Sequence, residues 1–391
     1  MQQLSLFSIF SILTNKLLNK FYTTIYAKIL LPMFYSDNLN TFVIDIGTET
    51  YKIGHAGTEL PYIYSSSRRH TNDFISPVTH SLITNLDEYT NIIEENVFYK
   101  EKNCNNKEKA IIQTDSEDGV NENNQLLYEN VNLLIAENTH ESHKTKEKLL
   151  EKLMETKKYN SIIFQKSSTL DLFSIGKTTG IVISLSGGST QVTSIVEGLI
   201  QNSKEYKMGG YNITQEYKNI INDIIPRGYT KEQFENIKNS NEQGFLLDEF
   251  YKEIKETTLS FDNSFYSYKN NKIEISASKL YSDIYDNIIK MVTEIIDESK
   301  IEDNLQILGN VFLCGGNKAK GLLEKLNTDL NNKFMNKIRI TDEKTYSTFL
   351  GGSILGSLGT FKSLSISYKD YEEHGVSILK RKKLEHVLYS K

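Results

Sequence analysis

Short runs of Val, Ile and Leu alternate with amphipathic stretches along most of the chain. Such runs are typical of strands inside a sheet, and we expect strands at Thr41–Ile46, 51–56, 133–137, Gly180–Leu185, 192–197, 272–275, Val311–Cys314 and 338–340. Apolar residues recur every three to four positions where we expect helices, at 146–158, 280–296, 320–331 and around Gly351-Gly352. Strands alternating with helices predict an α/β fold.

Three glycine turns follow expected strands and carry small or hydroxyl residues. They are Asp-Ile-Gly-Thr at 45–48, Ser-Gly-Gly-Ser-Thr at 186–190 and Cys-Gly-Gly-Asn at 314–317. Glycine lets the backbone approach a phosphate closely, and successive N–H groups form an anion nest. Facing turns of this kind could clamp the phosphates of a nucleotide, with Asp45 holding Mg²⁺ through water. Each turn alone is also explained by an ordinary hairpin, but their order favours a two-lobed nucleotide clamp.

Length and charge narrow the function classes. A chain of 391 residues is expected to form two to four domains or lobes, and its net charge of -5 gives no basic field for nucleic acid. Cys104 and Cys314 are far apart in the sequence and are expected to be free thiols. This pattern disfavours a disulfide scaffold and a cysteine-based zinc site.

Two segments differ from the rest of the chain. Residues 1–36 contain no Asp or Glu, and polar residues interrupt their apolar run, so neither a signal peptide nor a membrane span is predicted. The alternatives are a transit peptide, a helical appendage or an upstream extension with Met33 as the working start. The polar stretch 103–130 is expected to be an exposed loop, either solvated filler or a partner-binding segment.

The order of the motifs resembles the actin family from about residue 41 to residue 384. Val-Ile-Asp-Ile-Gly-Thr at 43–48 is similar to that family's first phosphate loop, and Gly-Lys-Thr-Thr-Gly-Ile-Val at 176–182 to the strand before its second. Met-Gly-Gly at 208–210 and Ile-Lys-Glu at 254–256 continue the resemblance. Ser-Tyr-Lys-Asp-Tyr-Glu-Glu-His-Gly at 367–375 resembles the family's C-terminal signature.

This resemblance implies an actin-like two-lobed ATPase fold, with duplicated sheet-and-helix lobes around a nucleotide cleft. The expected divisions are an N-terminal extension at 1–40, a first lobe at 41–174 plus 346–391, and a second lobe at 175–345. The first lobe would have a shortened second subdomain and the insertion 103–130. The resemblance also implies that ATP, if bound, is held structurally by Asp45, Gly47, Thr48, Lys52, Gly188, Gly210, Lys255, Glu256, Gly315 and Gly316.

Departures from the family predict a protein that is not an enzyme. The family's Mg²⁺-positioning carboxylate aligns with Ser184, its water-positioning glutamine with Ser167 and its second-loop histidine with Gln191. Losing a group that activates or orients water typically costs about 10²–10⁴ in rate, so we assign no catalytic residue and no metal ligand. Glu49 places a carboxylate where the family often has a small neutral residue, which would oppose phosphate. An empty, vestigial cleft is the alternative to structural ATP.

A second departure bears on self-assembly. Only residues 71–76 separate Arg-Arg-His at 68–70 from Pro77, where actin has a long excursion that contacts the next filament subunit. A head-to-tail filament needs both complementary patches, so self-polymerisation is not expected.

Short matches resemble the nuclear subclass that pairs with actin in chromatin-remodelling and histone acetyltransferase complexes. They are Lys-Ser at 166–167, Gly-Gly-Asn at 315–317 and Leu-Gly-Thr-Phe at 358–361. The resemblance implies a nuclear scaffold subunit, with the cytoplasm as the other location. Its partners would be actin, a long helix of a remodeller ATPase and, further, nucleosomes or histones, with no membrane partner. Phe173, Phe349 and Leu350 are candidates for the groove, although buried core positions explain each of them better. The alternatives are a divergent cytoskeletal actin-like protein and a weak ATPase of the actin-fold superfamily.

Overall fold

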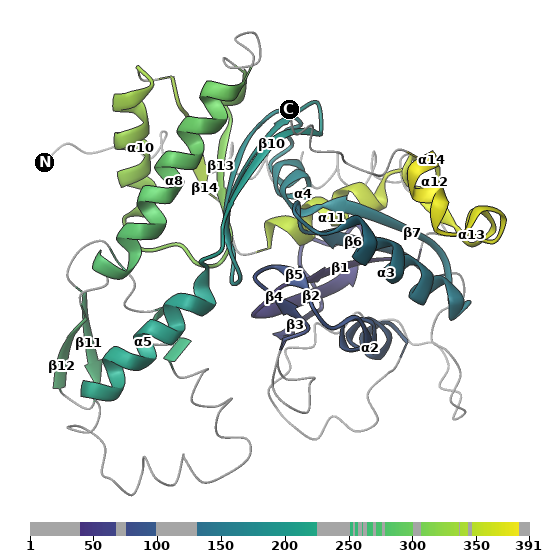
Figure 1. Ribbon diagram of the computed structural model, residues 1–391, viewed down its shortest axis with the longest axis horizontal. Helices are drawn as coiled ribbons and strands as arrows, with labels where there is room; N and C mark the ends of the chain where they lie inside the picture. The colour runs from purple at the N-terminus through teal and green to yellow at the C-terminus, as the bar shows by residue number, and fades with distance from the viewer. Residues whose placement is uncertain are drawn as a thin grey trace, which may run out of the picture.

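Two β-sheets, each covered by helices, lie side by side in the computed structural model (Figure 1). The structure describes residues 40–67, 76–98, 131–224, 251–252, 255–256, 260, 264–268, 271–275, 278–299, 306–335, 337–342 and 346–382. Outside the described residues lie the expected N-terminal extension up to residue 39, residues 68–75 and the polar stretch 103–130, which contains Cys104. No helix among the described residues is long and apolar enough to span a membrane.

The first sheet has the strand order β15-β7-β6-β1-β2-β3. Its strands are β1 (Thr41–Ile46), β2 (Thr50–His55), β3 (Ile63–Ser66), β6 (Val131–Glu137), β7 (Tyr159–Lys166) and β15 (Ile366–Ser367). Side chains alternate across β1 because successive residues of a strand face opposite sides. Phe42 and Ile44 pack against α2 (Leu86–Val97) and α3 (His143–Glu155), whereas Val43 packs against α4 (Ser167–Ser174) and α11 (Ser347–Ser357).

The second sheet has the strand order β10-β9-β8-β13-β14. Its strands are β8 (Gly180–Leu185), β9 (Thr190–Val196), β10 (Leu199–Tyr206), β13 (Val311–Cys314) and β14 (Ile340–Asp342). The helices α5 (Gly210–Ile224), α8 (Ser278–Glu298) and α10 (Leu322–Lys333) cover one face. Helix α4 reaches the other face: Leu170 packs with the first sheet and Leu172 with the second. The same short helix therefore joins the two halves.

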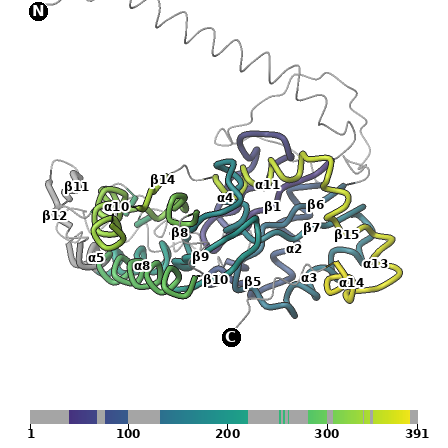
Figure 2. Tube along the Cα trace, turned by 90° about the horizontal axis from the view of Figure 1, so that it is seen from above, coloured from purple at the N-terminus to yellow at the C-terminus, as the bar shows by residue number. Residues whose placement is uncertain are grey.

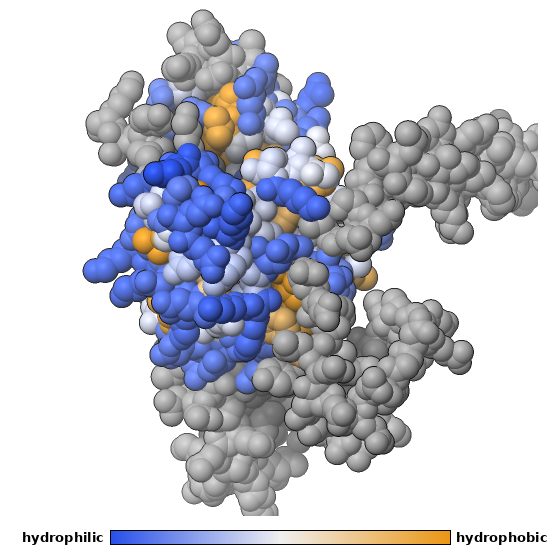
Figure 3. Space-filling view, turned by 90° about the vertical axis from the view of Figure 1, so that its right-hand side faces the viewer, coloured by the Kyte–Doolittle hydropathy of each residue, from blue (hydrophilic) through white to orange (hydrophobic). Residues whose placement is uncertain are grey.

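Smaller elements complete the fold. Two hairpins are β4 (Val78–Thr79) with β5 (Leu82–Ile83) and β11 (Ser264–Tyr268) with β12 (Asn271–Ile275). The chain then ends in α12 (Phe361–Leu364), α13 (Tyr368–His374), the 3₁₀ turn η2 (Gly375–Ser377) and α14 (Ile378–Arg381). Seen from above, α2, α3, α13 and α14 gather at one end of the molecule and α5, α8 and α10 at the other (Figure 2). The described surface of the first end is mostly hydrophilic, with small separate apolar patches (Figure 3).

The expected strands and helices are present, and the α/β class is confirmed. Two helices are displaced because local backbone geometry sets their ends. The helix expected at 320–331 begins at Leu322, since Gly321 before it is left-handed at φ 84°. The helix expected at 146–158 begins earlier, where the Ser142 side chain accepts from the Thr145 N–H, and Lys157 at φ 57° lies beyond its end. The strand expected at 338–340 lies at Ile340–Asp342.

Candidate functional site

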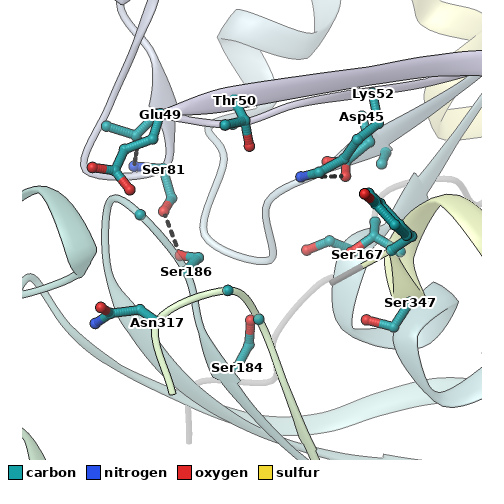
Figure 4. A pocket seen from close by; sticks show the side chains of 18 of the residues that line it. Asp45, Glu49, Thr50, Lys52, Ser81, Ser167, Ser184, Ser186, Asn317 and Ser347 are labelled. Atoms are coloured by element: carbon teal, nitrogen blue, oxygen red, sulfur yellow. Dashed lines mark hydrogen bonds and ion pairs between the residues drawn. The ribbon is translucent and has the colours of Figure 1, made fainter. Parts of the chain in front are cut away.

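A cavity of about 460 Å³ opens where the glycine turns of both sheets meet. It is lined by the turn after β1, the turn after β8, the segment 315–318 after β13, and residues of α4 and the start of α11. Figure 4 shows Asp45, Lys52, Ser167 and Ser347 toward one end of the cavity, and Glu49 and Asn317 toward the other. A concave site with a few convergent polar groups is the usual form of a small-molecule site.

Lys52 and Asp45 form an ion pair at the first of these ends. Residues 45 and 52 are direct cross-strand neighbours on β1 and β2, and Nζ of Lys52 lies 3.2 Å from Oδ2 of Asp45. Burial alone would lower the pKa of Lys52, but the Asp45 carboxylate outweighs it and raises this pKa above its usual value. Lys52 is therefore held as a cation at the cavity wall, beside Gly47, whose N–H donates to the carbonyl of Thr50.

Hydroxyl groups join the turns of the two halves. Ser81, in the turn between β4 and β5, donates its N–H to Oγ1 of Thr48 at 3.1 Å. Its Oγ lies 3.2 Å from Oγ of Ser186 and accepts from Oγ of Ser189 at 2.9 Å (Figure 4). A Cβ at Gly188 would stand 2.2 Å from Oγ1 of Thr48, so only glycine permits this approach. We call Thr48, Ser81, Ser186 and Ser189 the hydroxyl bridge.

The other end of the cavity brings together three polar side chains from separate segments. Lys255 is 3% exposed and donates to the carbonyl of Gly210 at 2.9 Å. Burial lowers the pKa of Lys255, and the carboxylates of Glu49 and Glu256 oppose that shift in part. A Cβ at Gly210 would lie 3.1 Å from Oε2 of Glu49, 3.2 Å from Nζ of Lys255 and 3.3 Å from Cγ of Asn317. The three side chains thus converge around one glycine.

The third glycine turn is fixed by its backbone. Gly315 has φ 93°, and a Cβ there would stand 2.3 Å from the carbonyl oxygen of Leu185. A side chain at this position is excluded on both grounds. The turn therefore approaches the second sheet closely enough for Asn317 to donate its N–H to that same carbonyl at 3.1 Å.

Asp171 is a cavity residue that sequence reasoning missed. It lies on α4, is 2% exposed, and accepts from Oγ of Ser347 at 2.7 Å and Oγ1 of Thr348 at 2.8 Å. Burial raises its pKa to about 6, although these hydroxyls and the Cys314 thiol oppose the rise. The available signal was a carboxylate within an otherwise uncharged helix, Ser-Ser-Thr-Leu-Asp-Leu-Phe-Ser. Cys314 itself is a free and buried thiol.

A second missed cluster lies behind the cavity. Glu137, at the end of β6, pairs with Nζ of Lys166 and with Nζ of Lys146, the latter at 2.9 Å. Burial would raise the pKa of Glu137, but the two ammonium groups outweigh it and hold that pKa below its usual value. The cluster is a charged core element that joins β6, β7 and α3, and Glu137 and Lys146 also border a smaller neighbouring cavity.

Most of the residues expected to bind a nucleotide line the cavity. They are Asp45, Gly47, Thr48, Lys52, Lys255, Glu256, Gly315 and Gly316. Gly188 and Gly210 do not line it but shape its walls, Gly188 in the contact with Thr48 and Gly210 beside Lys255. Ser184, Ser167 and Gln191, which stand at the departures from the family pattern, line it as well. Of the groove candidates, Phe349 is fully buried in the core.

Among the described residues, the side-chain amide of Asn317 is unpaired beside the cavity. Within the described part of the chain neither side-chain amide atom of Asn317 has a hydrogen-bond partner, although this residue is only 5% exposed and belongs to the cavity wall. Buried polar atoms are almost always paired, so the unpaired amide of Asn317 is an unusual feature of this wall. No group of three or more His, Cys, Asp or Glu among the described residues could hold a metal.

A comparison with protein-family models finds one match that covers most of the chain. The model described as Actin matches residues 64–277 and 264–384. These ranges contain strands β6, β7 and β15 of the first sheet and every strand of the second sheet. They also contain the second and third glycine turns, Lys255 and the C-terminal helices.

Proposed function

The chain belongs to the actin family, and from this we propose that it binds an adenine nucleotide without efficient hydrolysis and serves as a scaffold subunit. The observation that carries the proposal is the composition of the cavity wall. Lys52, Lys255 and Gly315 line the cavity and are residue types suited to binding a nucleotide. Ser184 and Ser167 stand at the positions where the family has its Mg²⁺-positioning carboxylate and its water-positioning glutamine. Lys52 would face the phosphates. Bound Mg²⁺ would supply charge neutralisation of the phosphates.

The test is the nucleotide content of purified protein, read by chromatography after denaturation, with thermal unfolding in the presence and absence of added Mg-ATP. ATP that persists for hours and a raised Tm support the proposal, since a ligand that binds only the native state stabilises it. No nucleotide and no shift in Tm would mean a vestigial cleft, and the function would then rest on partner surfaces alone.

A slow ATPase is the second candidate, and one observation favours it. Asp171 places a carboxylate with a raised pKa at the cavity wall, and perturbed acids in clefts are often functional. Formation of ADP by the wild-type protein, abolished in Asp171→Asn, would establish this candidate and overturn the proposal of a non-hydrolysing cleft.

We further propose a place for this scaffold in the nucleus, beside actin and a long helix of a remodeller ATPase. The support is the resemblance at Lys166, Asn317 and the Leu-Gly-Thr-Phe segment at 358–361. Nucleosomes or histones would be further partners. Helix-in-groove recognition suits such an assembly. The test of partner binding is co-elution of the purified protein with actin and a synthetic remodeller helix in size-exclusion chromatography. A sedimentation assay of the protein alone in polymerising salt tests self-assembly. A pellet in that assay would contradict the expected lack of filaments. A divergent cytoskeletal role would instead give binding to filament ends.

A further inference from the structure

We propose that His140 and Ser203 form a pH-sensitive latch between the two halves of the molecule, closed near neutral pH and released in acid. His140 lies in the loop after β6 of the first half, and Ser203 lies on β10 of the second half. Nε2 of His140 is 3.0 Å from Oγ of Ser203, a contact between segments 63 residues apart. We call this contact the His140–Ser203 latch.

A ring of buried hydroxyl groups positions the latch. From Ser203 the ring passes through β9 and α4 and returns to the residue before His140, with hydrogen bonds of 3.0, 3.3 and 3.1 Å that link Ser203, Thr193, Ser168 and Thr139. Hydroxyls donate or accept, so the ring can adapt to either protonation state of the imidazole. Among its members only His140 titrates between pH 5 and 8, so pH acts on the ring through this one side chain.

The surroundings disfavour a charge on His140. Burial lowers the pKa of His140 below its usual value, Lys166 and Lys207 act in the same direction, and Glu205 opposes them in part. Glu141, the next residue, already accepts from the N–H groups of Ile83 and Ser142. Ser203 could still accept from a protonated ring, so the cost of acid is the burial of charge rather than a lost hydrogen bond. The contact is therefore stable above the usual pKa of histidine and weakens as pH falls below it.

The latch is connected to the cavity wall. Ser203 and Glu205 lie on one face of β10, opposite Thr193 and Gln191 of β9. Gln191 lines the cavity, and its Nε2 donates to Oε1 of Glu205 at 2.9 Å and to Oγ of Ser189 at 3.2 Å. Ser189 belongs to the hydroxyl bridge, so both contacts between the halves are linked through Gln191. Release of the latch should therefore loosen the hold of the cleft on a nucleotide. This last step rests on the proposed function, whereas the latch itself does not.

The experiment measures the separation of the halves directly. Spin labels are attached to Lys148→Cys on α3 and Met335→Cys after α10, both exposed positions, in a full-length Cys104→Ser protein whose other cysteine, Cys314, is buried. Pulsed electron spin resonance then gives the distance between the labels at pH 7.5 and pH 5, the range over which histidine titrates. We expect a population with a longer distance to appear in acid.

Two histidine variants show whether His140 causes that change. In His140→Gln the side chain can still bond to Ser203 but cannot ionise, so we expect the same distances at both pH values. The control His374→Gln removes an imidazole from α13 and should behave like the parent protein. Ser203→Ala removes the partner without changing a charge, and it should show the longer distance already at pH 7.5. The Tm of each variant at pH 7.5 separates release of the latch from loss of folding.

Each outcome decides between the alternatives. Equal distances at both pH values in the parent protein, or the same acid response in His140→Gln, overturns the latch. If His140→Gln does not fold, Ser203→Ala decides in its place, and distances identical to those of the parent at both pH values overturn the latch. Release of a fluorescent ATP analogue should be severalfold faster at pH 5 than at pH 7.5 in the wild type and in His374→Gln, and nearly independent of pH in His140→Gln. Failure of the wild type to bind the analogue overturns the proposed function, while the distance measurement still decides the latch.

Discussion

Replacing Asp171 with asparagine should make the stability of the protein less dependent on pH. The carboxyl joins α4 to the first turn of α11 through Ser347 and Thr348, and it is fully enclosed. Asparagine keeps a carbonyl oxygen that can accept from both hydroxyls but cannot ionise. The substitution therefore removes the charge while retaining the hydrogen-bonded link.

The direction follows from the pKa of Asp171, which burial raises from 3.8 to about 6 in the folded state. Between these values the folded protein holds the proton more often than the unfolded chain, so this group's contribution to stability falls as pH rises. One pKa unit corresponds to about 1.4 kcal/mol, so the ionised group costs the native state roughly 3 kcal/mol above pH 6. We expect Asp171→Asn to be close to wild type near pH 4 and up to about 3 kcal/mol more stable at pH 7.5.

The assay is denaturant unfolding of both proteins at several values from pH 4 to pH 7.5. The quantity of interest is the difference in unfolding free energy, because other titrating groups contribute equally to both proteins. Asp297→Asn, which removes a carboxylate from an exposed position on α8, is the matched control and should give a small, nearly constant difference. A difference for Asp171→Asn that is constant across this range would refute the reasoning.

Three further outcomes are expected. Gly351→Ala should destabilise the protein by about 3 kcal/mol in chemical denaturation, because its Cβ would stand 1.8 Å from a carbonyl oxygen of α4, whereas Gly359→Ala, with open space around it, should change little. Glu137→Gln should cost on the order of 3–5 kcal/mol by the same measurement, since it leaves two buried ammonium groups without their carboxylate; a loss below about 1 kcal/mol would contradict this. Lys52→Met should weaken ATP binding about tenfold or more in calorimetry. The same change should leave adenosine binding nearly unchanged, because adenosine has no phosphate. Equal losses of affinity for both ligands would argue against contact between Lys52 and phosphate.

The central strands could be predicted because they are buried on both sides. A strand such as Val311–Cys314 has apolar residues at every position, so its run is visible without knowledge of its neighbours. Strand β7 was not predicted, because it begins with Tyr-Asn-Ser. Its Ser161 donates to the side chain of Asn132 on β6, a partner 29 residues away that no local pattern reveals.

The candidate site was predicted in part for a similar reason. Glycine turns after strands carry a local signal, and the positions of Gly47 and Gly315 could be taken from the sequence alone. The roles of Asp171 and Asn317 depend on distant segments: the hydroxyls that hold Asp171 lie 176 and 177 residues further along the chain. The direction of the Glu49 side chain depends on the absence of a Cβ at Gly187, and this contact forms only when the two halves meet.

The hydroxyl bridge has a consequence for how fast the cleft exchanges its contents. Its contacts between the halves run through neutral groups, Ser81 on one side and Ser186 and Ser189 on the other. Neutral hydrogen bonds in water contribute only about 1 kcal/mol each, so breaking the hydroxyl bridge should cost little free energy. The hydroxyl bridge itself should therefore add little ionic-strength dependence to the opening of the cleft.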